Sequence, residues 1–456
     1  MNPVLRSGSE SRDDGLTNTS SMATVPIVLR GAGEQGYIPP VPGSLKETGL
    51  SASFLEQLIL NHLYRRGEMS GRVIADAVGL DFRVIETILE EFKLRQIIEV
   101  KGSLGYGLVS STFALSETGR KRARDSASIN GYCGPAPVPI YQYAAVVEAQ
   151  RPKKGWITRE KLVEAYRHMV MTDRALSQIG PAVNSSRSFL VYGEPGNGKT
   201  YLAEALADID PTPIFIPYSI EHNGLIIQVF DPLIHRPVER GDRSIGLVNH
   251  QRASDSRWVL CRRPFVVTGG ELSLEMLELS YNENIKVYDS PCHLKANNGI
   301  YLIDDFGRQK VSPTDVLNRW IVPMESRVDH LRLPTGGKVT VPFEVFLIFS
   351  TNLSPQGLGD EAFLRRIQYK MFVQNPDVRE FVLIFRGLCV EKGLHCDVDM
   401  LDRFLERRYL STAKSFRRCH PRDLISHALD LMEFERLPRQ LTDDILDRAY
   451  ESCFVE

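Results

Sequence analysis

One short stretch of the sequence combines a glycine-rich turn with a lysine and a threonine, residue types suited to binding phosphate. An apolar run, Phe189 to Tyr192, leads into the letters GEPGNGKT, and apolar residues at helical spacing follow. The pattern G-x-x-x-x-G-K-[ST] between a strand and a helix lets backbone N–H groups surround nucleotide phosphates, because glycines leave no side chain in the way. Lys199 would neutralise phosphate charge, and the Thr200 hydroxyl would ligate Mg²⁺. The expected binding residues are Gly193, Glu194, Pro195, Gly196, Asn197, Gly198, Lys199, Thr200 and Tyr201.

Two carboxylates follow a second apolar run further along the chain. Residues Gly299 to Ile303 predict a buried strand that ends in Asp304 and Asp305. Buried strands seldom end in paired acids without a cation or a proton acceptor nearby. Asp304 is suited to holding Mg²⁺ through its water shell, and Asp305 to acting as the base that polarises an attacking water. A plain acidic strand end is the alternative.

A polar amide and two arginines complete the candidate set. Val345 to Phe349 predicts another buried strand, and Asn352 after it could orient the lytic water or simply form a turn before Leu-Ser-Pro. The stretch DEAFLRRI predicts an amphipathic helix that ends with Arg365 and Arg366. Such cations can reach the terminal phosphate held by a neighbouring subunit, as an arginine finger does. Taken alone, the pair is equally a charged helix end.

Five motifs stand in one order along the chain: GEPGNGKT, IYLIDD, FSTN, DEAFLRR and CHPRDL. In this order they resemble the Walker A, Walker B, sensor 1, arginine finger and sensor 2 motifs of the AAA+ ATPases, over about residues 155 to 456. The resemblance implies ATP and Mg²⁺ as cofactors, a homo-oligomeric hexameric ring, and Arg422 as the sensor 2 arginine that contacts the γ-phosphate from a helical lid. Most of the family has Asp-Glu where this sequence has Asp304-Asp305, so the base is one methylene shorter and hydrolysis could be slow.

The interval between the phosphate loop and the carboxylates is longer than a minimal module of this kind needs. Two strand-like pieces, Trp258 to Leu260 and Pro264 to Thr268, flank Cys261-Arg262-Arg263 within it. The interval resembles the β-hairpin that MoxR-type ATPases and bacterial enhancer-binding proteins carry inserted in their second helix. The later segment with Arg319 and Arg327 resembles the same branch. In that branch the inserted loops face the pore and push on a partner; an insertion that only packs on the sheet is the alternative.

The sequence before the ATPase-like part predicts a small separate domain. Apolar residues at helical spacing begin near Leu50, and further helices are indicated at about Val73 to Val78 and Asp81 to Arg95. The pieces IIEV and STFAL around a glycine-rich turn indicate a β-hairpin. Three helices followed by a hairpin resemble a winged helix-turn-helix domain, here at residues 46–125.

The charges of this domain leave its partner open. The third helix sets Arg83, Lys93 and Arg95 against four acidic residues, a net charge of −1, whereas entry into a DNA groove favours several positive charges. The one basic cluster, Arg120-Lys121-Arg122 with Arg124, is also what a solvated helix end would carry. Protein contact or intramolecular packing is therefore favoured, with duplex DNA binding as the alternative.

Composition sets the remaining boundaries. Residues 1–45 are serine-rich and end in IPPVPGS, which predicts a disordered tail. Residues 126–155 are punctuated by proline and glycine, which predicts a linker with a partly extended path. Residues 156–374 would form the AAA+ α/β domain with its insert, and residues 375–456 the lid. The expected fold class is an α/β P-loop core with a helical lid, preceded by an α+β winged-helix domain.

The overall composition excludes several classes of protein. The chain has 456 residues, 43% hydrophobic and 25% charged, which excludes wholesale disorder and a disulfide-stapled miniprotein. A net charge of −2 gives no overall field to hold the chain on nucleic acid or an anionic membrane. The 7 cysteines include no C-x-x-C pair, which favours free thiols and a cytoplasmic location. No apolar segment is long enough to cross a membrane, and no ligand pairs stand at zinc-finger spacing.

Two functions from different classes follow. We expect a cytoplasmic AAA+ ATPase that forms a ring and couples hydrolysis of Mg-ATP to remodelling of a protein partner, whose identity the sequence does not specify. The alternative is a DNA-binding winged-helix ATPase acting as a nucleotide-switched regulator or initiator, since P-R-D at sensor 2 also resembles the origin-recognition ATPases. An ATP-binding scaffold that barely hydrolyses ranks below both.

Overall fold

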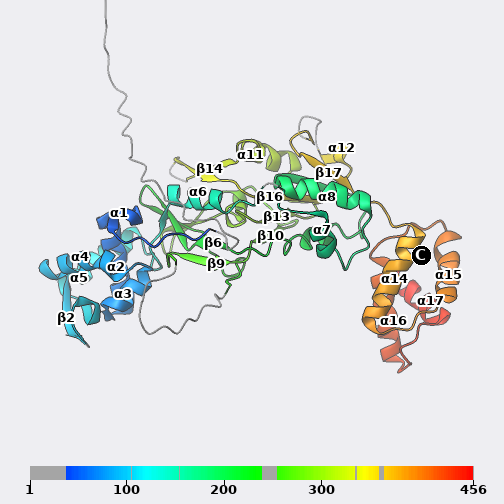
Figure 1. The fold of residues 1–456 in the computed structure, drawn as a ribbon, viewed down its shortest axis with the longest axis horizontal. Coiled ribbons are helices and arrows are strands. Elements are labelled where there is room, and N and C mark those ends of the chain that lie inside the picture. The colour runs from blue at the N-terminus through cyan, green and yellow to red at the C-terminus, as the bar shows by residue number, and fades with distance from the viewer. Residues whose placement is uncertain are drawn as a thin grey trace, which may run out of the picture.

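The computed structural model describes residues 37–103, 105–153, 155–238, 254–333, 336–358 and 364–454. Figure 1 shows three parts in a row: an N-terminal module in blue, a central α/β part in green and yellow, and a C-terminal helical part in orange and red. The expected disordered tail lies largely outside the described residues. Its end does not, because Tyr37 packs against a buried core and the Pro39 carbonyl accepts a hydrogen bond from the Asp255 N–H.

A five-stranded parallel sheet forms the centre of the molecule. Its strand order is β10-β13-β16-β5-β17. The strands are largely buried apolar runs, as expected for a parallel sheet covered on both faces. Their bounds are β10 Phe265–Thr268, β13 Ile300–Ile303, β16 Phe346–Thr351, β5 Ser188–Tyr192 and β17 Tyr369–Phe372.

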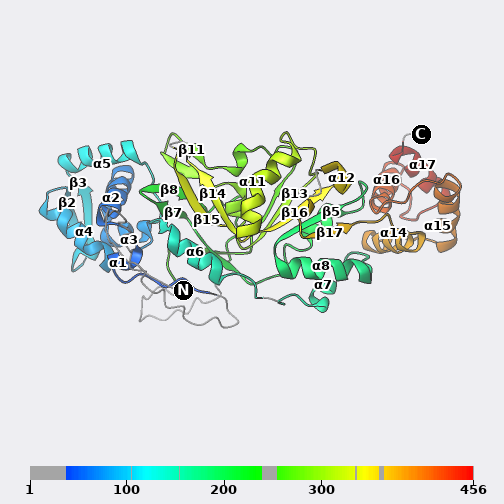
Figure 2. The same ribbon diagram turned by 90° about the horizontal axis from the view of Figure 1, so that it is seen from above.

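Helices cover the two faces of this sheet, as Figure 2 shows. Helices α7 (Arg159–Ala165) and α8 (Asp173–Ser185) lie on one side, where Ile179 and Val183 pack with the apolar residues of α9 (Lys199–Glu204). Helix α11 (Pro313–Ser326) lies on the other side and buries Trp320 against the sheet. Because both faces of the sheet are covered, its three central strands β13, β16 and β5 are largely buried, and their ends are where polar side chains can meet a ligand.

The expected insert is organised differently from the sequence interpretation. The second strand-like piece is β10, an edge strand of the central sheet, and not an arm of an inserted loop. The first piece is β9 (Trp258–Cys261), which pairs with β6 (Ile214–Pro217). Of the interval's residues, 239–253 lie outside the described part of the chain.

A second, mixed five-stranded sheet lies beside the first, in the order β11-β12-β8-β7-β4. The antiparallel pair β11–β12 belongs to this sheet, so the described part of the β10-to-β13 connection holds a hairpin that joins a sheet and lies between two short helical pieces. A separate hairpin, β14–β15, precedes β16. The bounds are β4 Val138–Pro139, β7 Ser219–His222, β8 Leu225–Gln228, β11 Ser280–Asn282, β12 Val287–Asp289, β14 Val328–Arg332 and β15 Lys338–Pro342; the connections hold η2 (Glu275–Leu277) and α10 (Cys292–Lys295).

The segment 126–155, predicted to be a partly extended linker, contains regular structure. It contains β4 and helix α6 (Ile140–Ala149), which buries Tyr143, Val146 and Val147 in the core of the second sheet. These residues are spaced three and four apart, so they lie on one helical face. The prolines and glycines of this segment stand before and after the helix and do not interrupt it.

The N-terminal module consists of residues 45–129, which form most of one buried apolar cluster. After the short α1 (Leu45–Thr48) come helices α2 (Ala52–Arg66), α3 (Gly71–Val78) and α4 (Phe82–Leu94). A strand between α2 and α3 and two strands after α4 form an antiparallel sheet of order β1-β3-β2. Helix α5 (Glu117–Ile129) ends the module. The sheet elements are β1 Met69–Ser70, β2 Ile98–Ser103, η1 Leu108–Ser110 and β3 Ser111–Leu115.

The module is docked on the second sheet. Ile226 of β8, Val287 of β12 and Tyr132, which follows α5, belong to the same buried cluster as the helices of the module. Asn61 of α2 donates hydrogen bonds to the carbonyl oxygens of Asn130 and Tyr132 at 2.7 and 3.2 Å. A shared apolar core and buried hydrogen bonds therefore fix one side of the module.

The C-terminal part is the helical bundle expected after residue 375. It consists of α14 (Val378–Lys392), α15 (Val398–Leu405), the π-helical turn η3 (Glu406–Leu410), α16 (His420–Phe434) and α17 (Asp443–Cys453). Phe381, Phe404, Tyr409 and Leu424 lie in its core. No helix among the described residues is both long and apolar enough to cross a membrane.

Candidate functional site: a phosphate loop under a helical lid

The glycine-rich loop begins where β5 ends. Gly193 has a φ of 150°, and a Cβ atom at this position would lie 2.5 Å from the Val373 carbonyl oxygen, so only glycine fits. Gly198 directly precedes α9, which starts at Lys199. Strand, loop and helix thus follow one another as the sequence predicts, and the first N–H groups of α9 face the loop.

Lys199 lies at the centre of the loop and is buried. Its Nζ donates hydrogen bonds to the carbonyl oxygens of Gly193 and Glu194, both at 3.0 Å, and to Asn352 Oδ1 at 2.6 Å. Burial lowers the pKa of Lys199, whereas Asp304 and the neighbouring Asp305 raise it. These three acceptors are neutral oxygens, and none of them is a carboxylate. An incoming phosphate therefore does not have to displace a carboxylate from one of these bonds in order to pair with the ammonium.

The predicted acids lie beside this lysine. Thr200 Oγ1 donates to Asp304 Oδ2 at 2.8 Å, which joins the start of α9 to the end of β13. Asn352 Nδ2 donates to Asp305 Oδ1 at 3.0 Å, so Asn352 bridges Asp305 and Lys199. Three neighbouring elements, α9, β13 and β16, therefore bring these five side chains to one edge of the sheet.

The donor set near Thr200 and Asp304 suits Mg²⁺, because a hydroxyl and a carboxylate are hard oxygen ligands. Within the described ranges no group of three or more His, Cys, Asp or Glu side chains could hold a metal ion. Mg²⁺ often binds through one or two carboxylates together with substrate phosphates and waters. These residues would fit a cation held jointly with a nucleotide.

The backbone at Asp305 is strained. Its φ of 48° lies in the left-handed region, which is uncommon for residues other than glycine. The Phe306 N–H donates to the Ser350 carbonyl oxygen at 2.7 Å and holds the turn in place. Strained residues of this kind cluster at functional sites, where the surrounding structure holds them in position.

The helical lid contacts the loop through its backbone and an arginine. The Cys419 N–H donates to the Gly196 carbonyl oxygen at 2.8 Å. Arg417 Nη1 lies 2.5 Å from Glu194 Oε2 and donates to the Pro195 carbonyl oxygen at 3.3 Å. The charge of Arg417 also lowers the pKa of Lys199, which places both cations in one electrostatic neighbourhood.

The connection into the lid adds amide contacts that sequence reasoning missed. Asn375 Nδ2 donates to Glu194 Oε2, and Asn197 Nδ2 donates to Asn375 Oδ1, both at 2.7 Å. The Arg418 N–H donates to Asn197 Oδ1 at 3.3 Å. In the sequence, Asn375-Pro376 indicates only a domain boundary. A polar amide at a hinge next to a ligand-binding loop could also have indicated a contact with that loop.

The structure places Arg422 away from the loop, contrary to its expected role. Its side chain is 72% exposed and pairs with the adjacent Asp423 at 3.1 Å. Among the described residues, the hydrogen bonds and ion pairs of Arg422 include none to the phosphate loop, whereas Arg417 is in contact with it. The difference arises because α16 starts at His420: the segment before the helix runs along the loop, and Arg422 lies on the first turn facing solvent.

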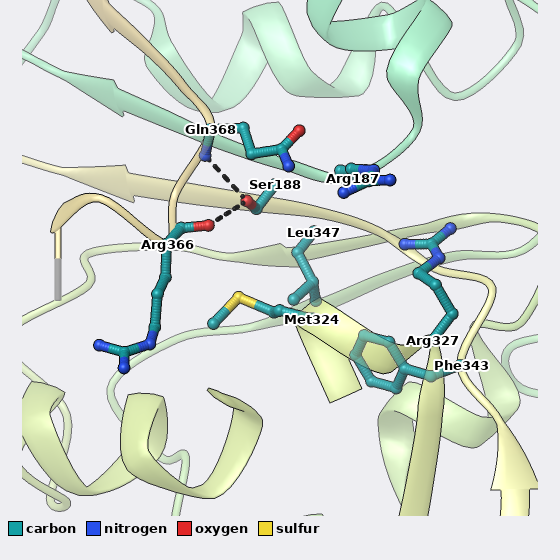
Figure 3. A pocket seen from close by; sticks show the side chains of 8 residues that line it. All are labelled: Arg187, Ser188, Met324, Arg327, Phe343, Leu347, Arg366 and Gln368. Atoms are coloured by element: carbon teal, nitrogen blue, oxygen red, sulfur yellow. Dashed lines mark hydrogen bonds between the residues drawn. The ribbon is translucent and has the colours of Figure 1, made fainter. Parts of the chain in front are cut away.

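Arg365 and Arg366 lie at the amino end of β17, near the start of β5. The Ser188 hydroxyl donates to the Arg366 carbonyl oxygen at 3.3 Å and accepts from the Gln368 N–H at 3.2 Å, as Figure 3 shows. Arg366 Nε lies 3.3 Å from Glu325 Oε1. The pair is thus separated from the loop of its own chain by the length of β5; residues 359–363 of the expected helix lie outside the described part.

The remaining loop residues differ in exposure. Asn197 is buried, whereas Tyr201 is 51% exposed on α9.

Arg319 and Arg327, assigned from the branch resemblance, pair with acids within the fold: Arg319 with Asp329 at 2.6 Å, and Arg327 with Glu344 at 2.8 Å. These two arginines stabilise the packing of α11 and the β14–β15 hairpin, remote from the loop.

Comparisons with known proteins add a match to the lid and likenesses to solved structures. A family described as a domain of unknown function (DUF8689) matches residues 377–452. No curated protein matches the sequence. Similar solved structures include NtrX from Brucella abortus, at 14% identity and a TM-score of 0.38, covering 64% of this chain and 57% of that one. NtrX in complex with ATP has 15% identity and a TM-score of 0.36, covering 63% and 58%. A mutant of RuvB from Thermotoga maritima has 14% identity and a TM-score of 0.34, covering 66% and 73%.

Proposed function

We propose that this chain is an ATPase of the AAA+ type that binds and hydrolyses Mg-ATP. The observation that carries the proposal is the convergence of Lys199, Thr200, Asp304, Asp305 and Asn352 at the carboxyl edge of the central sheet. These residues come from parts of the sequence far apart, and their types are those that phosphoryl transfer requires. Ligands of open α/β sheets bind at this edge.

Each residue has a role that its geometry supports. The loop backbone and Lys199 hold the β- and γ-phosphates, and Thr200 and Asp304 hold Mg²⁺, which neutralises charge that develops on the phosphates. Asp305 accepts a proton from water, and Asn352, already bonded to Asp305, orients that water. Asp305 reaches one methylene less far than a glutamate, so we expect slow turnover.

Within the lid, we assign the phosphate-contacting role to Arg417 and not to Arg422. Arg417 already lies on the loop, 2.5 Å from Glu194, and a shift of its guanidinium from the carboxylate to a phosphate exchanges one anionic partner for another. Nucleotide binding would thereby replace the direct contact of Arg417 with the loop by a contact of Arg417 with the bound nucleotide.

The oligomeric form of the proposal is a homo-oligomeric, hexameric ring that remodels a protein partner. Its support is the position of Arg365 and Arg366 at the amino end of β17, where they cannot reach the loop of their own chain along the length of β5. Cations in this position can reach a nucleotide held by a neighbouring subunit. We also propose that the chain is related to the MoxR and enhancer-binding branch. The N-terminal module is proposed to be a winged-helix domain.

The test combines binding and turnover on the full chain. We expect Mg-ATP to bind, Lys199→Ala to abolish binding, and Asp305→Asn to retain binding without hydrolysis. The rate per chain should rise steeply with protein concentration, and Arg366→Ala mixed into wild type should suppress it. Full activity in Lys199→Ala refutes the site, and a rate independent of concentration refutes the shared interface.

A further inference from the structure

The N-terminal module presents one face that nothing in the ATPase proposal uses. One side of the module is fixed to the second sheet through Ile226, Val287 and Tyr132. Helix α5 runs along an outer edge of the module in Figure 2, opposite α1 and α3. Its buried residues Gly119 and Ala123 face the module, and the other side of the helix faces solvent.

That solvent face is basic. Arg120, Lys121, Arg122 and Arg124 are all exposed, and four cations against Glu117 and Asp125 give α5 a net charge of +2. At 100° per residue, Arg120, Lys121 and Arg124 fall within an arc of about 100° on one side of the helix. The same arc holds Glu117, so this face carries a net charge of +2. Within the described part of the chain, no ion pair links any of the four cations to an acid. Their charge is therefore available to a ligand.

Helix α4, which occupies the position of a groove-reading helix, offers no such surface. Its Arg83 pairs with Asp81 at 3.2 Å, and Arg95 pairs with Glu91 at 3.0 Å. The hairpin is also neutralised locally, because Lys101 pairs with Glu99 at 2.7 Å. A polyanion approaching the module would therefore be attracted to α5 and not to α4 or the hairpin.

The position of α5 is rigid. A Cβ atom at Gly119 would lie 2.0 Å from the Ile97 carbonyl oxygen, so the helix packs directly on the backbone before β2. The Ser116 hydroxyl caps the helix by accepting from the Gly119 N–H at 3.0 Å, and it donates to the Gln96 carbonyl oxygen at 2.7 Å. The cations thus extend from a fixed scaffold, which suits contacts to a regularly charged partner.

The composition of the face distinguishes nucleic acid from protein. Protein interfaces depend on buried aromatic or aliphatic anchors. Along α5, which the structure describes in full, the only strongly exposed large hydrophobic side chain is Ile129 at the end of the helix. Contacts to a duplex backbone need cations and no apolar centre. We propose that the outer face of α5, carried by Arg120, Lys121 and Arg124, binds the phosphate backbone of duplex DNA without reading its sequence.

The proposal predicts a salt dependence. Neutralising three phosphates gives a slope of log K against log[salt] of about −2.7, which corresponds to about 40-fold weaker binding between 50 and 200 mM salt. The measurement is fluorescence anisotropy of a labelled 20-base-pair duplex titrated with the full chain, without nucleotide.

A matched pair of variants locates the surface. Arg120→Ala/Lys121→Ala/Arg124→Ala removes three charges from α5, and Arg83→Ala/Lys93→Ala/Arg95→Ala removes three charges from α4. We expect the α5 variant to bind at least tenfold more weakly at 50 mM salt with a slope near zero, and the α4 variant to bind as wild type. Equal losses in both variants, or a larger loss in the α4 variant, overturn the proposal.

Two further arms separate this proposal from its rivals. Poly-glutamate of equal charge, used as competitor, should displace the duplex poorly; displacement as efficient as by unlabelled duplex points to an acidic protein partner and overturns the proposal. Lys199→Ala should bind the duplex as wild type does, because the surface is independent of the nucleotide site. Circular dichroism melts of both triple variants verify folding, and an α5 variant that is folded yet binds like wild type also overturns the proposal.

Discussion

The reassignment of the lid arginine makes a quantitative prediction for Arg417→Ala. A hydrogen bond between charged groups contributes about 1.5–3 kcal/mol. Without nucleotide, Arg417 is paired with a half-exposed Glu194, and such surface pairs contribute about 0–1 kcal/mol. The difference of about 1–2 kcal/mol is what the arginine adds to nucleotide binding, so Arg417→Ala should weaken binding about 5- to 30-fold.

The assay is an equilibrium titration of the full chain with a fluorescent ATP analogue in the presence of Mg²⁺. Arg422→Ala is the matched control, since it removes the same charge five residues further on, and it should change the dissociation constant by less than about twofold because Arg422 pairs only with Asp423 in the described structure. A second arm is Glu194→Gln, which leaves Arg417 without its carboxylate and should tighten binding. Weaker binding in Arg422→Ala with unchanged binding in Arg417→Ala refutes the reasoning.

Three further predictions concern the loop, the base and the lid. Gly193→Ala should abolish nucleotide binding and lower the melting temperature, because its Cβ atom would lie 2.5 Å from the Val373 carbonyl oxygen; a binding-competent, equally stable variant contradicts this. Asp305→Glu should keep or raise the steady-state hydrolysis rate, and a large loss means that the base is misassigned. Burial, with two nearby cations, lowers the pKa of His420 to about 4, below its unfolded value, so stability is lost as pH falls from about 6.5 towards 4. The contribution of His420 to the loss at pH 5 is at most about 2 kcal/mol, measured by denaturant unfolding. His420→Gln should remove this contribution and leave those of His62 and His235, whose pKa values burial also lowers.

Local sequence patterns were sufficient for the loop and its neighbouring acids. The glycines, Lys199 and Thr200 are adjacent in sequence, so their arrangement depends on one strand, one turn and one helix. Asp304 and Asn352 follow buried apolar runs, and the carboxyl ends of neighbouring parallel strands lie at one edge of a sheet. Their convergence follows from that topology, without knowledge of side-chain packing.

The sequence did not indicate which lid arginine meets the loop, that β10 belongs to the central sheet, or that α6 forms. These features depend on packing between parts of the chain that are far apart in sequence. Which lid arginine meets the loop depends on where α16 begins and on the orientation of the whole bundle, and neither can be read from the letters around Arg417. The sequence does not distinguish β10 from part of an insert, because an edge strand of four residues has no distinctive pattern. Helix α6 was hidden by the prolines before it, although Tyr143, Val146 and Val147 carry a helical spacing.

The hydrogen bond from Cys419 to Gly196 has a kinetic implication. The bundle already contacts the glycine-rich turn when no phosphate is present, so a triphosphate arriving from solution meets a binding site that is partly covered. Uptake would then be limited by how often the bundle lifts, and crowding the solution with ligand would accelerate capture only up to that frequency.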